Sequence, residues 1–497
     1  MKSIKLIVLL SSFSLFSQSV ELRWADKINT RGDVSILGGV DGNYFTSHRN
    51  SDNQLVCRVY DKALSLKDEK TVSFNLDEKK YFYMNAFFLK KNIVHFILDR
   101  QKKEDKYYLY AASTDLKLVT SEQTKIIDEA SDDDFINESV HISPDSSKIV
   151  VYNEHKGKRK EPNTLSFKVY NTEFTELLLD KTLQLPIKSR DYTTVSTQVD
   201  NIGNIYVLAK VDKERDERAK DQSKYYYKVI VINNDATPKE FDFDYPERDI
   251  ESIDILPGEN NTLICTGFLK VLSKGFLSSN KKTLISDEMF SAIIDCKTTT
   301  LKSSTKYELE GLYPEKPKKA EDYVPYKVRN IFYKKDGGSV VVAEQYKLVV
   351  VTRSSQYGTS TTYYYYYCDI ACIQINEKSE VVSVSKMPKY QMNAKNPSII
   401  STHFDGSTYI VYEDLEKNAN AEGDKDTKRS TNGFFSSDNK NALFLLTIAP
   451  SGEMKKEIIY SYKDSKIRPN IKASSVISKN EMMMNANDQI GVLKINK

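Results

Sequence analysis

Residues 334–346 read KKDGGSVVVAEQY, a polar turn that leads directly into a short apolar strand. Gly, Asn and Asp fit two-residue hairpin turns because they tolerate the positive φ that such turns require. The same combination of turn and strand occurs eight times along the chain. The eight turns lie at residues 40–43, 90–92, 143–146, 201–204, 257–260, 335–338, 404–406 and 478–481. The chain is therefore built on an internal repeat.

A third apolar strand follows each turn and strand after a variable segment. The third strands are expected at residues 55–60, 107–112, 165–170, 225–232, 290–294, 366–375, 443–448 and 490–495. Many of them have apolar residues on both faces, which is typical of strands that are buried on both sides. A fourth strand with alternating polar residues completes the unit, as at residues 380–387.

Four antiparallel strands that recur every ~50 to 75 residues, each sheet covered by its neighbours, predict an all-β fold, a single β-propeller. We expect eight four-stranded blades, with seven blades or a large β-sandwich as alternatives. The last unit ends after its third strand, whereas residues 20–28, VELRWADKI, have the pattern of a fourth strand. We therefore expect the N-terminal strand to pair with residues 490–495 and to close the last blade.

The composition excludes several classes of protein. Only 18 of the 497 residues are Gly, which rules out collagen-like and Gly/Ser-linker architectures. The 72 Lys and Arg residues nearly balance 69 Asp and Glu, so no strong field directs the chain to nucleic acid or to an anionic membrane. The chain has 32 Tyr and 21 Phe beside one Trp, an aromatic excess that suits β-strands.

Residues 1–18 have the pattern of a secretory signal peptide, which leaves residues 19–497 as the propeller domain. Lys2 and Lys5 precede an apolar stretch that is too short to span a bilayer, and Ser17 and Ser19 are small enough for a signal peptidase. We expect cleavage near one of these serines, with an uncleaved anchor as the alternative. The mature protein would then be periplasmic, associated with the outer surface or extracellular, without a transmembrane segment.

The five cysteines show no zinc or redox spacing. Cys368 and Cys372 are too far apart along one strand for a disulfide, which leaves Cys265 with Cys296 as the pair to test. Buried free thiols are the expected state.

A resemblance supports the propeller fold and export. Residues 334–338 and 343–346, followed by KMPKYQ at residues 386–391, resemble a group of uncharacterised secreted bacterial β-propeller proteins. The similarity is clearest over residues 250–497. It implies a fold and a compartment but no reaction.

The lengths of the connections give the best functional signal. Six long segments separate second from third strands, at residues 99–106, 153–163, 212–224, 270–288, 352–362 and 413–440. In an antiparallel blade these connections all lie on one face of the disc. Variation concentrated on one face of a repeat protein is typical of a binding face, although solvated decoration is the alternative, especially for residues 416–429.

Clusters of tyrosine follow three of these segments. The candidate binding residues are Tyr107, Tyr108, Tyr225, Tyr227, Tyr363 and Tyr365. Phenol rings combine flat apolar area with a hydrogen-bonding hydroxyl, which suits peptide or sugar binding. The alternative is that these rings only fill space between blades.

No catalytic motif is present, and the five histidines lack metal-ligand spacing, so we predict no catalytic residue, metal site or cofactor. His95 and His141 are expected to be packed in strands. The sequence favours a non-catalytic exported propeller that binds a protein or a cell-envelope polymer. The alternative is a propeller that cleaves polysaccharide or peptide with carboxylates around its central channel.

Overall fold

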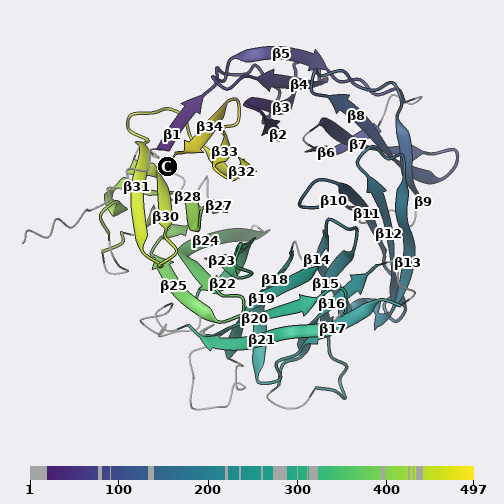
Figure 1. Ribbon diagram of the computed structural model, residues 1–497, viewed down its shortest axis with the longest axis vertical. Helices are drawn as coiled ribbons and strands as arrows, with labels where there is room; N and C mark the ends of the chain where they lie inside the picture. Colours follow the sequence, from purple (N-terminus) through teal and green to yellow (C-terminus); the bar gives the residue numbers. More distant parts are fainter. Residues whose placement is uncertain are drawn as a thin grey trace, which may run out of the picture.

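The computed structural model describes residues 20–496, except 77–80, 90, 132–138, 219–221, 234–236, 259–260, 272–287, 299, 310–311, 313–322, 357, 393–397, 422, 424–425, 429 and 432–439. The predicted signal peptide lies outside the described residues. Strands form seven four-stranded sheets and one six-stranded sheet, arranged in a ring (Figure 1). Within the described ranges there is no α-helix, and hence no helix that could cross a membrane.

The ring has eight blades, as the repeat predicted. Blade 1 consists of β2 (Ser35–Val40), β3 (Asn43–Arg49), β4 (Leu55–Tyr60) and β5 (Leu66–Thr71), and blade 2 of β6 (Tyr81–Phe88), β7 (Asn92–Gln101), β8 (Lys106–Asp115) and β9 (Lys125–Ser131). Blade 3 consists of β10 (Ser139–Ile142), β11 (Lys148–His155), β12 (Pro162–Asn171) and β13 (Leu177–Lys188), and blade 4 of β14 (Tyr192–Val199), β15 (Ile205–Asp212), β16 (Tyr225–Ile232) and β17 (Lys239–Phe243).

The second half repeats this order. Blade 5 consists of β18 (Arg248–Pro257), β19 (Thr262–Val271), β20 (Glu288–Asp295) and β21 (Thr300–Glu308). Blade 6 has β22 (Tyr326–Tyr333), β23 (Ser339–Ser355), β24 (Gly358–Ile375) and β25 (Val381–Met387), extended by β26 (Gln391–Met392) and β29 (Ser430–Thr431). Blade 7 has β27 (Ile399–Phe404), β28 (Ser407–Leu415), β30 (Asn441–Ile448) and β31 (Met454–Ser461), and blade 8 has β32 (Asn470–Ser478), β33 (Glu481–Asn485), β34 (Ile490–Ile495) and β1 (Val20–Trp24).

The closing strand lies where the sequence predicted it. β1 pairs antiparallel with β34, from Val20 opposite Ile495 to Trp24 opposite Gly491. The Trp24 ring lies against Gly491, where a Cβ atom would come within 2.7 Å of it. Chain ends that are far apart in sequence thus complete one four-stranded sheet, in which β1 is the outer edge strand, and this closes the ring.

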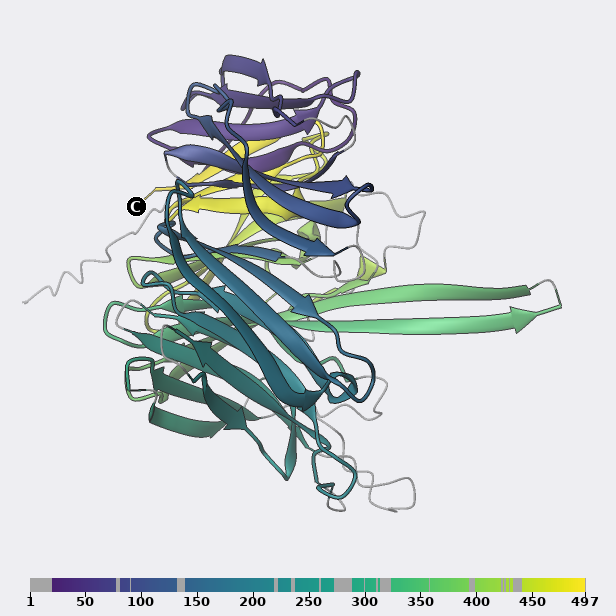
Figure 2. The same ribbon diagram turned by 90° about the vertical axis from the view of Figure 1, so that its right-hand side faces the viewer.

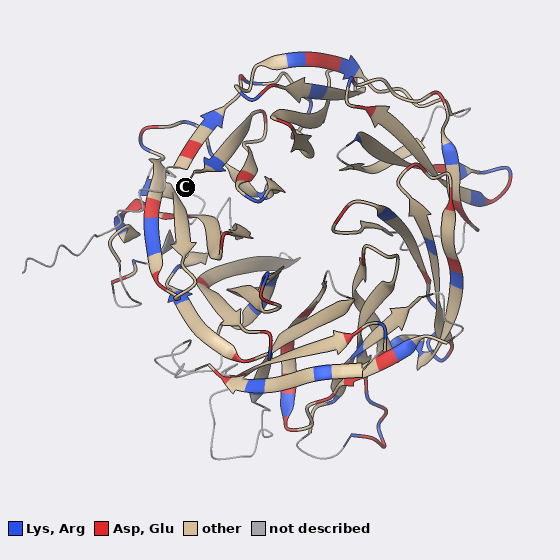
Figure 3. Ribbon diagram, in the orientation of Figure 1, with Lys and Arg blue, Asp and Glu red and all other residues tan. Residues whose placement is uncertain are grey.

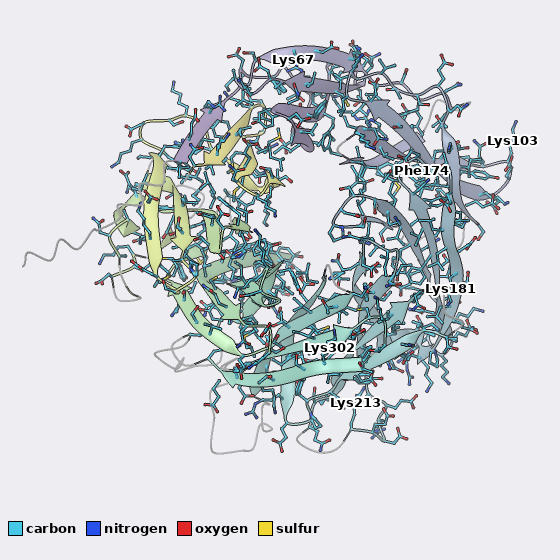
Figure 4. All side chains as sticks on the ribbon, in the orientation of Figure 1. Lys67, Lys103, Phe174, Lys181, Lys213 and Lys302 are labelled. Carbon is cyan, nitrogen blue, oxygen red and sulfur yellow. The ribbon has the colours of Figure 1, made fainter. Side chains whose placement is uncertain are left out.

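The core lies between the blades, which is why strands in the middle of each blade are apolar on both faces. Val150 and Phe167 of blade 3 pack in one cluster with Val207 and Ile230 of blade 4. Phe174 fills the gap between blades 2 and 3, with its ring 6.1 Å from that of Phe96 (Figure 4). Ring closure therefore comes from eight interblade layers of apolar side chains.

Charged residues are concentrated on the outermost strands and the connections (Figure 3). Lys67 and Lys181, on β5 and β13, lie at the outer rim (Figure 4). β5 has the pattern LKDEKT and is mostly exposed. Because these outer strands are the edges of their sheets, charged side chains also discourage pairing with other chains.

The innermost strands carry a recurring irregularity. In five blades the inner strand has one extra residue opposite the second strand, a β-bulge. The extra residues are Leu37, Met84, Val195, Glu251 and Arg329. β32 has a wider one between Asn470 and Ser475. Bulges redirect side chains. At these positions the side chains of the innermost strands therefore no longer alternate regularly between the two faces of the sheet.

The segment at residues 352–362, expected to be a connecting loop, is mostly β-strand, and that prediction was wrong. β23 and β24 continue past the blade as a two-stranded ribbon that projects from one face of the ring (Figure 2). The Val, Thr and Tyr residues of this stretch have high β propensity and pair in an unbroken register. We call the face that bears this ribbon the ribbon face, and the opposite face, with the eight first turns, the turn face.

Candidate binding site

The ribbon is paired from Tyr346 opposite Tyr367 to Ser355 opposite Gly358. Side chains directly opposite one another point to the same side of a strand pair, and successive pairs alternate. One side therefore carries Leu348 with Tyr365 and Val350 with Tyr363. The exposed fractions of these four side chains are 42%, 40%, 50% and 52%, respectively. We call this side the apolar face of the ribbon.

The apolar face ends before the tip of the ribbon. Its next pairs outward are Thr352 with Thr361 and Ser354 with Thr359. Residues 346–367 contain Lys347 and Arg353 but no acidic residue. The ribbon thus offers an apolar patch near the ring, a polar tip and a small positive charge.

The base of the ribbon is fixed to the ring. The backbone N–H of Tyr346 donates to the carbonyl of Pro325 at 2.9 Å, and Lys347 Nζ donates to the carbonyl of Tyr323 at 3.0 Å. β26 pairs with β24 at Tyr366 and Tyr367. The ribbon is therefore held at its base while its outer part has no strand beside it within the described residues.

Arg329, the bulge residue of β22, lies at the base of the ribbon. Its guanidinium carbon is 5.4 Å from the ring centre of Tyr346 and 5.8 Å from that of Tyr367, distances at which a cation is attracted to the ring face. Its Nε donates to Glu344 Oε2 at 3.0 Å. The two tyrosines belong to the same side of the ribbon as the apolar face, so that face runs down to Arg329.

Lys472 reaches the same point from blade 8. It lies in the wide bulge of β32, which is held together by bonds from Ser474 Oγ to the Asn470 carbonyl and from the Ala473 N–H to Asn470 Oδ1. Lys472 Nζ donates to the hydroxyl of Tyr367 at 2.8 Å and is 5.1 Å from its ring centre. Two bulged inner strands thus bring two cations to one tyrosine.

Glu344 is the carboxylate that holds Arg329 at the base of the ribbon. Its side chain is fully buried, as is that of Lys389, whose Nζ lies 2.5 Å from Glu344 Oε1. Ser398 Oγ donates to Glu344 Oε2 at 3.2 Å. A buried carboxylate needs such partners because no water can solvate it.

Sequence reasoning missed this glutamate, although a signal was present. Glu154, Glu344 and Glu413 each follow the apolar run of a second strand, in blades 3, 6 and 7, and all three are buried. Asn163 donates to Glu154 at 2.8 Å, and Asn441 donates to Glu413 at 2.7 Å. A glutamate that recurs after the apolar run of a buried strand indicates a buried carboxylate with hydrogen-bond partners.

The predicted tyrosines lie at the ribbon face, but the structure does not gather them. Tyr107 and Tyr108 lie at the start of β8 in blade 2. Tyr108 donates to Glu104 at 2.6 Å, and this bond is the main reason that the pKa of Tyr108 rises to about 12. Arg100 lies 5.6 Å from the ring centre of Tyr107.

Tyr225 and Tyr227 begin β16 in blade 4, half-buried, with ring centres 6.0 Å apart. Lys210 Nζ lies 3.8 Å from the ring centre of Tyr225, whose hydroxyl donates to the carbonyl of Ile250 in the next blade. A complete blade separates each tyrosine pair from the next. Tyr363 and Tyr365, on the ribbon, are the predicted residues that lie with the site described here.

The turn face carries a separate hollow of about 760 Å³ between the first turns of blades 6, 7 and 8. Asp336 and Asp405 are its acidic residues. Burial alone would raise the pKa of Asp336, but bonds from the Gly338 N–H and from Lys334 hold that pKa below its ordinary value. Asp336 is thus a turn-stabilising carboxylate and a poor proton donor at neutral pH.

The other residues considered for chemistry have structural roles. None of the five cysteines forms a disulfide, Cys265 and Cys296 included, and all five are buried. His95 bonds Tyr83 and Thr114 inside blade 2, and His141 bonds Ser139 in β10. No group of three or more His, Cys, Asp or Glu within the described ranges is arranged to hold a metal ion.

No protein-family model matches the chain, and no curated protein is significantly similar to it in sequence. Solved structures of similar shape include the WD40 domain of SCAP from fission yeast, with 10% identity, a TM-score of 0.40 and coverage of 97% of this chain and 98% of that chain. The Dos1 propeller has 8% identity, a TM-score of 0.42 and 95% coverage of both chains. The polysaccharide lyase PL25, an ulvan lyase, has 10% identity, a TM-score of 0.37 and coverage of 95% and 96%. The propeller assignment itself rests on the strand topology of the chain.

Proposed function

We propose that this chain is a non-catalytic binding propeller that recognises a protein or a cell-envelope polymer through its ribbon face. The observation that carries the proposal is the ribbon, which holds four large apolar side chains away from the ring with 40% to 52% of each exposed. Exposed apolar side chains gathered in one patch are typical of an interaction site.

The stability of the ribbon supports the same conclusion. An isolated two-stranded hairpin is only marginally stable in water, and beyond its base the ribbon has no third strand among the described residues. A partner that lies along it would cover apolar area and complete its backbone pairing. The ring supplies a rigid base for such contact.

Export is part of the proposal. Lys2, Lys5 and the apolar residues that follow have the pattern of a signal peptide, which would place the propeller outside the cytoplasm. We propose a periplasmic, surface-associated or extracellular location, where envelope proteins and polymers are the available partners.

A polysaccharide- or peptide-cleaving activity remains a prediction without a supporting site. Two carboxylates near the ribbon face are held in ion pairs: Glu251 of β18 with Lys270 and Lys327, and Glu344 of β23 with Arg329 and Lys389. Glycoside hydrolysis instead needs two carboxyl groups that flank the substrate, and carboxylates held in ion pairs with Lys and Arg do not form such a pair.

Photo-crosslinking tests the binding proposal. p-Benzoylphenylalanine would replace Val350 or Tyr363 on the apolar face, and Ile202 on the turn face or Val382 on the outer strand β25 as controls, both of which are also exposed. Exposure to the envelope fraction of the source organism should give crosslinked species from positions 350 and 363 alone. Equal crosslinking from positions 202 and 382, or none from the ribbon, would refute the proposal.

A further inference from the structure

The apolar face of the ribbon leads to a positively charged site at its base. Arg329 and Lys472 both contact Tyr367, and Lys389 lies behind them on Glu344. Arg329 and Lys389 share one carboxylate, that of Glu344, and Lys472 forms no ion pair within the described part of the chain. The base of the ribbon therefore has an excess of positive charge that a bound anion would balance.

The half-buried Arg329 and the exposed Lys472 both keep hydrogen-bonding capacity. Lys472 is exposed and has three donors, of which the hydroxyl of Tyr367 takes one; no carboxylate in the described part of the chain lies within ion-pair distance of it. Arg329 directs Nε and Nη2 at Glu344, and no described acceptor contacts its Nη1. A carboxylate bound here would receive donors from two blades.

The site is positioned before any ligand arrives. Arg329 is held by the Glu344 ion pair and by the faces of Tyr346 and Tyr367. Lys472 is presented by the bulge of β32, whose internal bonds fix its backbone. Side chains that are already ordered lose little conformational entropy on binding.

The ribbon next to this site is suited to an extended chain. Leu348 with Tyr365 and Val350 with Tyr363 form successive rungs along the same side as Tyr346 and Tyr367. Within the described residues, no strand pairs with the outer edges of the ribbon at residues 349–354 or 359–364. An edge with unpaired backbone groups can add a strand from a partner. Polysaccharides cannot pair in this way, and the ribbon has no acidic residue to repel an anionic peptide.

We propose that the ribbon binds an extended polypeptide segment whose carboxylate lies between Arg329 and Lys472. The carboxylate comes either from the end of the partner chain or from an acidic side chain. The inference rests on the proposed binding function and specifies its ligand. The polar tip, with Ser354 and Thr359, argues against insertion into a membrane, because an inserting tip would be apolar.

Fluorescence anisotropy with the full mature chain tests this inference. The probe is a library of fluorescein-labelled 12-residue peptides with alternating apolar and polar residues. Each peptide is made with a free C-terminal carboxylate, with a C-terminal amide, and as an amide with Glu as the last residue. Short oligogalacturonates serve as an anionic polysaccharide arm.

We expect both carboxylate-bearing forms to bind, one of them more tightly than the other. The neutral amide should bind with an affinity at least ~10-fold lower. Lys472→Ala should remove most of that difference, whereas Lys479→Ala, in the turn directly after the same inner strand, should change binding less than ~2-fold. Val350→Ser should weaken binding ~10-fold, and its control Val382→Ser should not. Thermal unfolding of each variant checks that the ring is intact.

Three results would overturn the inference. The first is that no peptide binds, and the second is that carboxylate and amide forms bind equally. The third is that oligogalacturonate binds through Lys472 while peptides do not, which would leave a binding propeller with a different ligand. Loss of all crosslinking from positions 350 and 363 would instead refute the binding function itself.

Discussion

The buried ion pair below the ribbon gives the sharpest test of how the site is held. Glu344→Gln keeps the shape of the side chain but removes its charge from a position that is fully buried. Lys389 then has only neutral acceptors, the amide oxygen of the new side chain and Gln391 Oε1 at 3.2 Å, and remains fully buried. Arg329 also loses its carboxylate, but its side chain is 27% exposed and can be hydrated.

The expected loss of stability comes from the buried ammonium group of Lys389, which no longer has a carboxylate partner. Removing one partner of a buried ion pair typically costs ~3–5 kcal/mol, because the remaining charge is uncompensated. We expect Glu344→Gln to lower the free energy of unfolding by that amount. Adding Lys389→Met removes the stranded charge at similar length, so the double variant should be more stable than the sum of the single changes by ~1–3 kcal/mol.

Equilibrium unfolding in guanidinium, followed by far-UV circular dichroism, measures these differences. Trp24, the single Trp of the chain, lies in the closing strand β1 and reports ring opening by its fluorescence. Glu129→Gln is the matched control, because Glu129 and Lys106 form an exposed pair at 3.0 Å, which is worth ~1 kcal/mol or less. A cost for Glu344→Gln no larger than that of Glu129→Gln, or strict additivity in the double variant, would refute the reasoning.

Three further predictions concern closure, pH and thiols. Gly491→Ala places a Cβ within 2.7 Å of the Trp24 ring, so Trp24 emission should shift and the melting temperature should fall. The control Gly423→Ala, where a Cβ would meet no atom within 4 Å, should change neither the emission nor the melting temperature. Burial lowers the pKa of His95 to about 4, below its unfolded value of ~6.5, so the unfolded state binds the extra proton between these pH values. Stability should therefore fall by up to ~3 kcal/mol as pH drops from 6.5 to 4, and His95→Gln should flatten the dependence measured by unfolding at pH 4.5 and 7.5. Burial also raises the pKa of Cys57 and Cys372 to about 12, which keeps these thiols protonated and unreactive. A thiol reagent should therefore react with none of the five buried cysteines in the folded protein and with all five in guanidinium. Fast reaction of the folded protein would contradict their burial.

Much of the fold could be predicted because its signals are local. The turn at residues 335–338 and the apolar run after it fix a hairpin by residue type and period alone. The closing strand β1 could be inferred because the eighth unit has three strands of its own. These features need no knowledge of which residues meet across the ring.

The site could not be predicted in the same way. The ribbon forms because β23 and β24 stay paired in register through Val350 and Tyr363. That register depends on both strands together and cannot be inferred from the sequence of either one alone. Arg329 is an unremarkable basic residue until a bulge directs it at Tyr346 and Tyr367. Glu344 and Lys389 are 45 residues apart, and only the packing of blade 6 brings them together.

A variant without the ribbon tests the central claim most directly. Residues 348–365 would be replaced by a two-residue Asn-Gly turn that joins Lys347 to Tyr366, which are opposite one another in the strand pair. We predict that the ring keeps its circular dichroism spectrum and its Trp24 emission, while capture of partners from the envelope fraction is lost. Capture of the same partners at undiminished levels by this variant would contradict the claim that the ribbon face is the binding surface.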